Sequence, residues 1–171
     1  MRASDQTHFV KTHQPRDENV HDADGAICLV RDGRDALVSW ARQRSELDDR
    51  RYEDELRTLI TKPDTRGAGQ WGRNISSWLV PDAPNRVVMR FEDLIHAPAE
   101  TVTAAMALVA PGPVPQPDAV IPSFADLHTI DDRFFRRGIT GTHHDELPTD
   151  LNQAFWDQPD NQTAMDLLGY R

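Results

Sequence analysis

The sequence predicts an α/β domain in which a mainly parallel sheet is flanked by helices. Two observations predict this class: short apolar runs rich in β-branched or aromatic residues, and helix-like stretches that separate them. A chain of 171 residues is long enough to bury a core, and it shows no repeat and no second domain. We therefore expect a single domain over residues 1–171.

Three short runs have the character of buried strands. They are residues 8–12 (HFVKT), 26–30 (AICLV) and 87–91 (VVMRF). Each is brief, contains β-branched or aromatic side chains, and is flanked by polar or turn-forming residues, which favours a buried strand.

The remaining patterned stretches predict helices. Asp32-Gly33 forms a cap or turn before the first, Pro63 stops the second, and Pro98 is tolerated in a first turn because its missing N–H has no helical partner there. The expected helices are 34–44, 47–61, 69–79, 98–109, 151–156 and 161–168.

Polar and aromatic side chains follow the three predicted strands. His13 comes after the first strand, Arg31 after the second, and Phe91 at the end of the third. Ligands of parallel sheets bind beyond the carboxyl ends of the strands. A base, a guanidinium and an aromatic ring at one edge suit an aromatic phosphate ester. His13 is then a general base, and the alternative is an ordinary polar loop residue.

Arg31 and Ser39 are eight residues apart, at the start of the first predicted helix. The helix amino end, Arg31 and the Ser39 hydroxyl could converge on one phosphate. The alternative is that Arg31 pairs with Asp35 and that Ser39 faces solvent, and the residues alone favour neither.

Arg136, Arg137 and Gly138 stand together in a loop-like region, which suits a phosphate clamp. Taken alone, a solvated basic patch is the better interpretation. Phe91 and Phe124 could stack on a base, although such phenylalanines more often belong to a core.

Two short motifs do not indicate a binding site. Residues 67–72 spell G-x-G-x-x-G but follow no strand, so they are not a dinucleotide fingerprint. Residues 143–146 (HHDE) have neither the spacing nor a partner cluster for a metal, so we expect them at the surface and expect no metal site.

Composition excludes several partner classes. The net charge of −9 leaves no basic surplus for nucleic acid or an anionic membrane. Cys28 is the single cysteine, so no internal disulfide forms and no structural zinc site is indicated. No apolar run approaches membrane-spanning length, and we expect a cytoplasmic protein.

Four segments together resemble sulfotransferases that use 3′-phosphoadenosine-5′-phosphosulfate (PAPS), of the cytosolic or bacterial type. Residues 11–15 (KTHQP) resemble the family's K-T-H-x-P element, and 29–40 (LVRDGRDALVSW) resemble its 3′-phosphate-binding strand and helix. Residues 89–94 (MRFEDL) resemble the Y-E-D-L element, and 134–141 (FFRRGITG) are similar to F-R-K-G-x-x-G.

The resemblance implies a sulfotransferase that moves a sulfonyl group from PAPS to the hydroxyl or amine of a small-molecule acceptor and releases 3′-phosphoadenosine-5′-phosphate (PAP). His13 would take the acceptor proton, and Lys11 would help to hold the sulfonyl region. Phe91 and, less securely, Phe124 would lie beside adenine. The residues implied for the 3′-phosphate are Arg31, Ser39, Arg136, Arg137 and Gly138.

The sequence departs from the family at its start, where a strand and a P-K-S-G-T-T-W loop would cradle the 5′-phosphosulfate. We therefore expect an N-terminally truncated form of the P-loop-like sulfotransferase fold. Removing even one donor to the transferring group typically costs ~10²–10³ in rate, so we expect little turnover from the isolated chain. Thr142, His143 and His144 also replace the family's usual G-D-W continuation.

Two other functions stay open. The chain could be a catalytically incompetent fragment or subunit that binds 3′-phosphoadenosine compounds, with a missing N-terminal segment or a second subunit as its partner. A nucleotide kinase shares the general α/β plan, and dependence on ATP and magnesium would be its signature.

Overall fold

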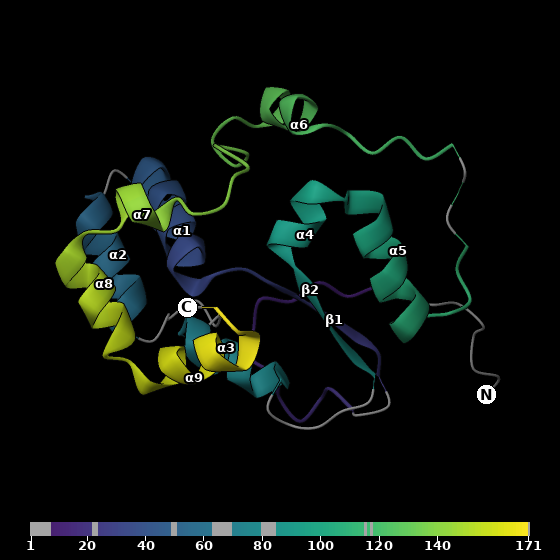
Figure 1. Cartoon of the computed structure of the whole chain (residues 1–171), viewed down its shortest axis with the longest axis horizontal. Helices are drawn as coiled ribbons and strands as arrows, with labels where there is room; N and C mark the ends of the chain where they lie inside the picture. Colours follow the sequence, from purple (N-terminus) through teal and green to yellow (C-terminus); the bar gives the residue numbers. More distant parts are fainter. Residues whose placement is uncertain are drawn as a thin grey trace.

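The computed structural model describes residues 8–21, 24–48, 51–62, 70–79, 85–114, 116 and 118–170. Within them, two strands are embedded among helices (Figure 1). In chain order the elements are β1 (Ala26–Val30), α1 (Gly33–Asp48), α2 (Tyr52–Thr61), α3 (Trp71–Leu79), β2 (Arg86–Arg90), α4 (Phe91–His96), α5 (Pro98–Val109), α6 (Phe124–Ile130), α7 (His143–Glu146), α8 (Thr149–Trp156) and α9 (Pro159–Leu168).

The two strands pair in parallel, and this small sheet among helices is consistent with the predicted α/β class. Their register runs from Ala26 opposite Arg86 to Val30 opposite Arg90. Parallel neighbours need a crossover connection, and helices α1 to α3 supply it. Helix α5 packs against both strands, while α1, α2, α7 and α8 gather at the other end of the molecule (Figure 1).

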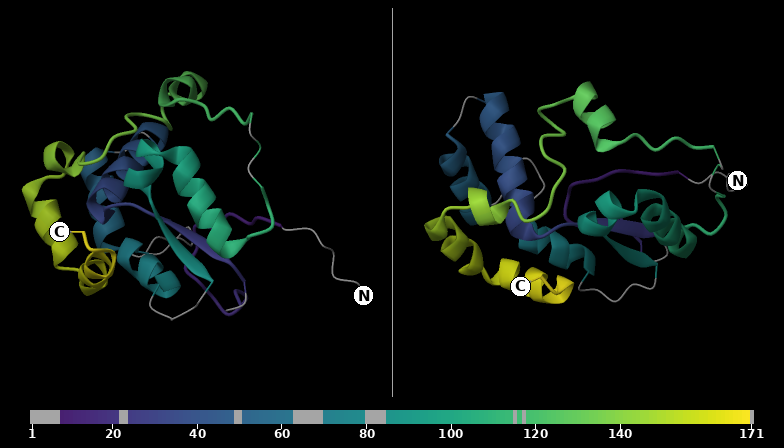
Figure 2. Two further views of the ribbon diagram at one scale, coloured as in Figure 1. Left: turned by 45° about the vertical axis from the view of Figure 1, so that its right-hand side comes forward. Right: turned by 45° about the horizontal axis from the view of Figure 1, so that its top comes forward.

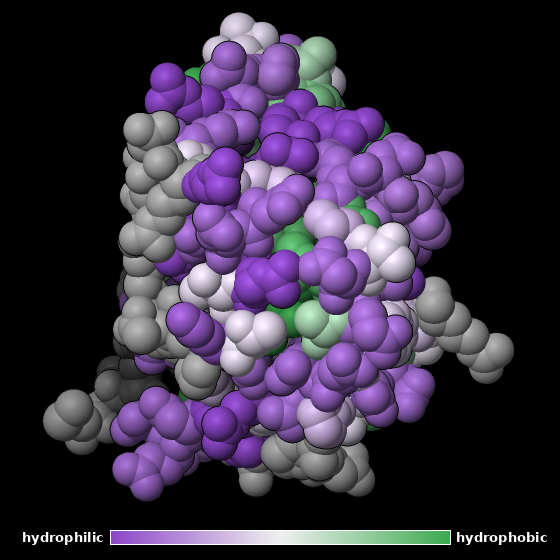
Figure 3. All heavy atoms as spheres, turned by 90° about the vertical axis from the view of Figure 1, so that its left-hand side faces the viewer, coloured by the Kyte–Doolittle hydropathy of each residue, from purple (hydrophilic) through white to green (hydrophobic). Residues whose placement is uncertain are grey.

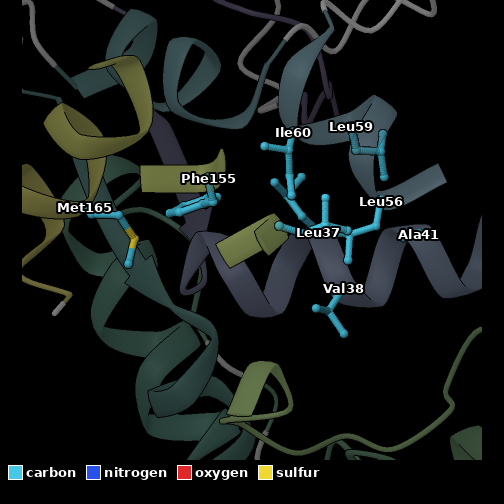
Figure 4. Close-up of a cluster of buried hydrophobic side chains, with 9 residues drawn as sticks. Leu37, Val38, Ala41, Leu56, Leu59, Ile60, Phe155 and Met165 are labelled. Carbon is cyan, nitrogen blue, oxygen red and sulfur yellow. The ribbon is translucent and has the colours of Figure 1, made fainter. Parts of the chain in front are cut away.

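The main apolar core joins four helices (Figure 4). Leu37 of α1 faces Leu56 and Ile60 of α2, and Phe155 of α8 and Met165 of α9 extend the cluster. A buried ion pair between Arg44 and Glu55 also ties α1 to α2. These contacts hold α1 against α2 and α8, and α1 begins three residues after β1 ends.

Two glycines allow helix α3 to lie close to its neighbours. A Cβ on Gly33 would lie 2.7 Å from the Trp71 ring, and one on Gly72 would lie 2.3 Å from the carbonyl oxygen of Asp160. The amide of Gly72 also donates to Oδ1 of Asn161 at 3.2 Å. Gly72 thus serves helix packing; residues 67–69 of its G-x-G-x-x-G run lie outside the described residues.

The predicted strand at 8–12 is wrong, because these residues form no strand. The side chains of Phe9 and Val10 are 69% and 88% exposed, so no neighbouring layer covers the apolar run. A strand also needs a ladder partner for its backbone groups. Within the described chain, β1 and β2 pair with each other and leave 8–12 without a partner.

The predicted bounds agree with the structure where the signal is local. The ranges 26–30 and 98–109 match β1 and α5. The predicted helix at 47–61 is divided instead between the end of α1 and α2, and Phe91 begins a helix rather than ending a strand. The prediction missed α4, α6 and α7.

Helix α6 stands apart from the other helices (Figures 1 and 2). The residues that lead from it to α7 contain turns and bends. A capping box stabilises its start: Ser123 Oγ accepts the Asp126 amide at 3.2 Å, and the Ser123 amide donates to Asp126 Oδ2 at 2.9 Å. The face that carries α2 and α8 is largely hydrophilic with small apolar patches (Figure 3). No helix in the described residues is long and apolar enough to cross a membrane.

Candidate functional site

The ends of the two strands meet at Arg31. It follows β1 directly, and its guanidinium lies 4.6 Å from the ring centre of Phe91, which follows β2. Its Nη2 donates to the carbonyl oxygen of Ile139 at 2.8 Å and approaches Oδ2 of Asp35 at 3.4 Å. The expectation that residues after parallel strands meet at one edge is therefore correct for Arg31 and Phe91. The alternative pairing of Arg31 with Asp35 is present as well.

Asp35 of α1 fastens the loop that follows Gly138. Its side chain is 1% exposed and accepts the amides of Gly141 and His143 at 2.6 and 2.8 Å, the Thr142 hydroxyl at 3.1 Å and Nδ1 of His143 at 2.7 Å. Burial raises the pKa of this carboxyl, but the hydrogen bonds from His143 and Gly141 and the charge of Arg31 outweigh it and lower the pKa. Asp35 is therefore an anionic anchor for residues 141–143.

Glu146, at the end of α7, gathers three arginines. Its Oε1 accepts Nη2 of Arg136 at 3.1 Å and Nη1 of Arg137 at 2.7 Å, and its Oε2 accepts Nε of Arg42 at 2.8 Å. The Glu146 side chain is 10% exposed. Burial raises its pKa, but hydrogen bonds from Arg136, Arg42 and Arg137 outweigh it and lower the pKa. The two predicted clamp arginines are thus held side by side by one partly buried carboxylate.

Gly138 needs to be glycine for two reasons. Its φ of 59° lies in the left-handed region, and a Cβ there would lie 2.3 Å from the Phe124 ring. Phe124 is 41% exposed and stacks on His128 with ring centres 6.0 Å apart. The core interpretation of Phe124 is therefore wrong: the ring borders the arginine-bearing loop and is partly open to solvent.

Ser39 is exposed on α1, three residues before Arg42. Residues three apart lie on one face of a helix, so Ser39 and Arg42 share a face. In the described part of the chain, Arg31 donates to Asp35 and Ile139, and no hydrogen bond joins it to the Ser39 hydroxyl.

Lys11 and His13 lie outside this constellation. Their side chains are exposed and, within the described chain, form no hydrogen bond or ion pair. The backbone beside them runs along α3: Asn74 Nδ2 donates to the His13 carbonyl at 2.8 Å, and Trp78 Nε1 donates to the Gln14 carbonyl at 3.0 Å. We expected His13 to lie beside Arg31 and Phe91, but in the described residues His13 contacts α3 instead.

The sequence analysis missed three site residues: Arg42, His143 and Glu146. It placed residues 143–146 at the surface, but His143 is 9% exposed and is bonded to Asp35. Their partners lie up to 108 residues away, so local sequence gave no signal. Among the described residues, no group of His, Cys, Asp or Glu could hold a metal ion.

Comparison with known proteins finds a similar fold but no similar sequence. No family model and no curated protein sequence matches the chain. The fold is nevertheless sulfotransferase-like. Among solved structures it is similar to mouse sulfotransferase SULT7A1 complexed with PAP, with a TM-score of 0.64, 15% identity, and coverage of 87% of this chain and 64% of that chain. The chain thus spans less than two thirds of that protein's length.

Proposed function

We propose that this chain binds the 3′-phosphate and adenine of PAPS or PAP and acts in sulfonyl transfer. One observation carries the proposal: the loop with Arg136, Arg137 and Gly138 is docked through Asp35 onto the helix that begins beside Arg31. Two sequence segments that resemble the 3′-phosphate elements of sulfotransferases are thereby brought together. The similarity in fold to a sulfotransferase complexed with PAP supports the same class.

The site has the chemistry that a nucleotide phosphate needs. The side chains of Arg136 and Arg137 are 28% and 40% exposed, so part of each guanidinium faces solvent and can donate to phosphate oxygens. Ser39 offers a hydroxyl from α1. Phe124 borders Gly138 with a partly open ring that can stack on a base.

In the proposed reaction, the acceptor oxygen or nitrogen attacks sulfur, and the bond between sulfur and the 5′-phosphate oxygen of PAPS breaks. His13 takes the acceptor proton, and Lys11 offsets the developing negative charge. PAP and the sulfated acceptor leave. Such transfer depends on in-line positioning and on neutralising spread charge, and it needs no metal in this scheme.

A second candidate is a binder without turnover. No described contact joins Lys11 or His13 to the group around Arg31 and Glu146, and the backbone at His13 is bonded to α3 instead. This favours the binder, because a general base must lie beside the reacting groups. This candidate shares the 3′-phosphate site and differs from the first in catalysis.

Calorimetric titration with PAP tests the shared part. Arg137→Gln removes one proposed phosphate contact, whereas Arg57→Gln removes an equally charged, exposed arginine that pairs with Asp150 on α8. We expect the wild type to bind, Arg137→Gln to bind about tenfold more weakly, and Arg57→Gln to match the wild type. Absence of PAP binding by folded wild type, or equal losses in both variants, overturns the proposal.

Turnover separates the two candidates. PAP release from PAPS is measured with a panel of hydroxyl and amine acceptors, for the wild type and His13→Ala. Release that requires acceptor and disappears in His13→Ala supports the transferase. PAP binding without any release favours the binder.

A further inference from the structure

Arg42 has the position and the spare donors of a ligand-binding residue. Its Nε is taken by Glu146, and its guanidinium face lies 3.6 Å from the ring centre of Tyr52. Its side chain is 35% exposed, and within the described chain its terminal nitrogens have no protein partner. Arg42 and Ser39, three residues apart, share one face of α1.

Charge points to the kind of ligand. Glu146 binds Arg42, Arg136 and Arg137, so the group carries three positive charges and one negative charge. The excess of two positive charges matches a phosphate monoester, which carries about −1.5 to −2 at neutral pH. A neutral acceptor would not offset this excess.

Glu146 gives the three arginines a fixed arrangement. Guanidiniums at such close range repel one another, and the shared carboxylate between them offsets that repulsion. The carbonyl oxygen of Glu146 also accepts the Tyr52 hydroxyl at 2.7 Å, and burial raises the pKa of Tyr52 to about 12, so the hydroxyl stays protonated. Donors held in place before the ligand arrives bind it without an added ordering cost.

We propose that Arg42 is a third arginine of the 3′-phosphate site and that Glu146 positions all three arginines for the phosphate. This inference rests on the proposed function and extends it. It assigns a binding role to Arg42 and a positioning role to Glu146, which contacts the guanidiniums and leaves their exposed edges to the ligand.

The test compares two nucleotides that differ by the 3′-phosphate: PAP and adenosine 5′-phosphate. The readout is the ratio of their Kd values, obtained by direct and competition calorimetry. We expect Arg42→Gln and Glu146→Gln each to lower this preference for PAP about tenfold while affinity for adenosine 5′-phosphate holds. Arg57→Gln, the charge-matched control outside the group, should keep the wild-type ratio.

Thermal melts establish that each variant is folded. If Arg42→Gln is unstable, Arg42→Lys keeps the charge without the planar fork and is expected to lower the ratio as well. An unchanged ratio in the Arg42 variants overturns its assignment. Tighter PAP binding by Glu146→Gln would show that Glu146 competes with the phosphate and overturns the positioning role. Wild type that binds no PAP removes the proposed function itself, and this inference with it.

Discussion

The Asp35 anchor predicts a specific loss of stability in Asp35→Asn. The substitution keeps the side-chain shape but replaces one acceptor oxygen with an amide NH₂ group. In the wild type, the Gly141 amide donates to Oδ2 of Asp35 at 2.6 Å. If the remaining oxygen of the asparagine faces His143 and Thr142, its NH₂ group faces this Gly141 amide. Two donors then oppose each other in a buried site. Losing a charge-assisted hydrogen bond and burying an unsatisfied donor costs about 2–4 kcal/mol.

A cost of this size is measurable by thermal unfolding followed by circular dichroism. For a chain of this length we expect Tm to fall by about 5–15 °C. Asp150→Asn is the matched control, because it also removes a carboxylate paired with an arginine, but one with a side chain 63% exposed. Its Tm should stay close to that of the wild type. If Asp35→Asn melts with the control, the loop is not held by Asp35 and the reasoning fails.

Three further predictions concern the loop, the core and pH. Gly138→Ala should lower the free energy of unfolding by about 1–3 kcal/mol, because the φ of 59° and the Phe124 ring at 2.3 Å both oppose a Cβ. Gly112→Ala is the control: a Cβ there would have nothing within 4 Å, so its urea unfolding should match that of the wild type. Phe155→Ala removes a ring that is 0% exposed and packs 6.0 Å from Trp71, and it should lower the free energy of unfolding by about 3–5 kcal/mol; a cost below about 1 kcal/mol would mean that the core is misassigned. The pKa values of Asp35 and Glu146 are lowered from 3.8 and 4.5, so the stability they contribute is complete above those values and is lost as pH falls through the depressed ones. Wild type should therefore lose stability more steeply than Asp35→Asn or Glu146→Gln below about pH 4, and parallel acid-unfolding curves would contradict the assignment.

Local patterns were enough to predict some elements. The run at 26–30 forms β1 because it is brief, apolar and flanked by turn-forming residues, and Pro98 begins α5 because its ring suits a first helical turn. The run at 8–12 had the same apolar character but forms no strand. Strand formation depends on a distant partner, and apolar composition does not reveal whether that partner is present.

The short helices show a second limit. Helix α6 begins with the capping box of Ser123 and Asp126, a signal present in the sequence but easily overlooked because aspartate replaces the usual glutamate. Helix α7 has four residues, too few for a periodic pattern. It is held in place by the bond from His143 to Asp35 on α1, which no local pattern encodes.

Some residues of the candidate site could be predicted from the sequence and others could not. Arg31 and Phe91 could be placed together because the carboxyl ends of parallel strands meet at one edge. Glu146 and Arg42 could not be placed, because their roles come from tertiary contacts with residues of other elements. From sequence alone, a charged residue in a polar stretch cannot be distinguished from a solvated one, because its partners are distant in the chain.

The central claim is that the loop at 136–141 and the start of α1 form one nucleotide site. Amide chemical-shift mapping of the labelled chain during a PAP titration tests it most directly. We predict that the largest shifts fall on the amides of Arg31 to Ser39 and of Arg136 to Gly141, with smaller shifts at the amide of Phe124. Absence of shifts at saturating PAP, or shifts centred on another face of the molecule, would contradict the account.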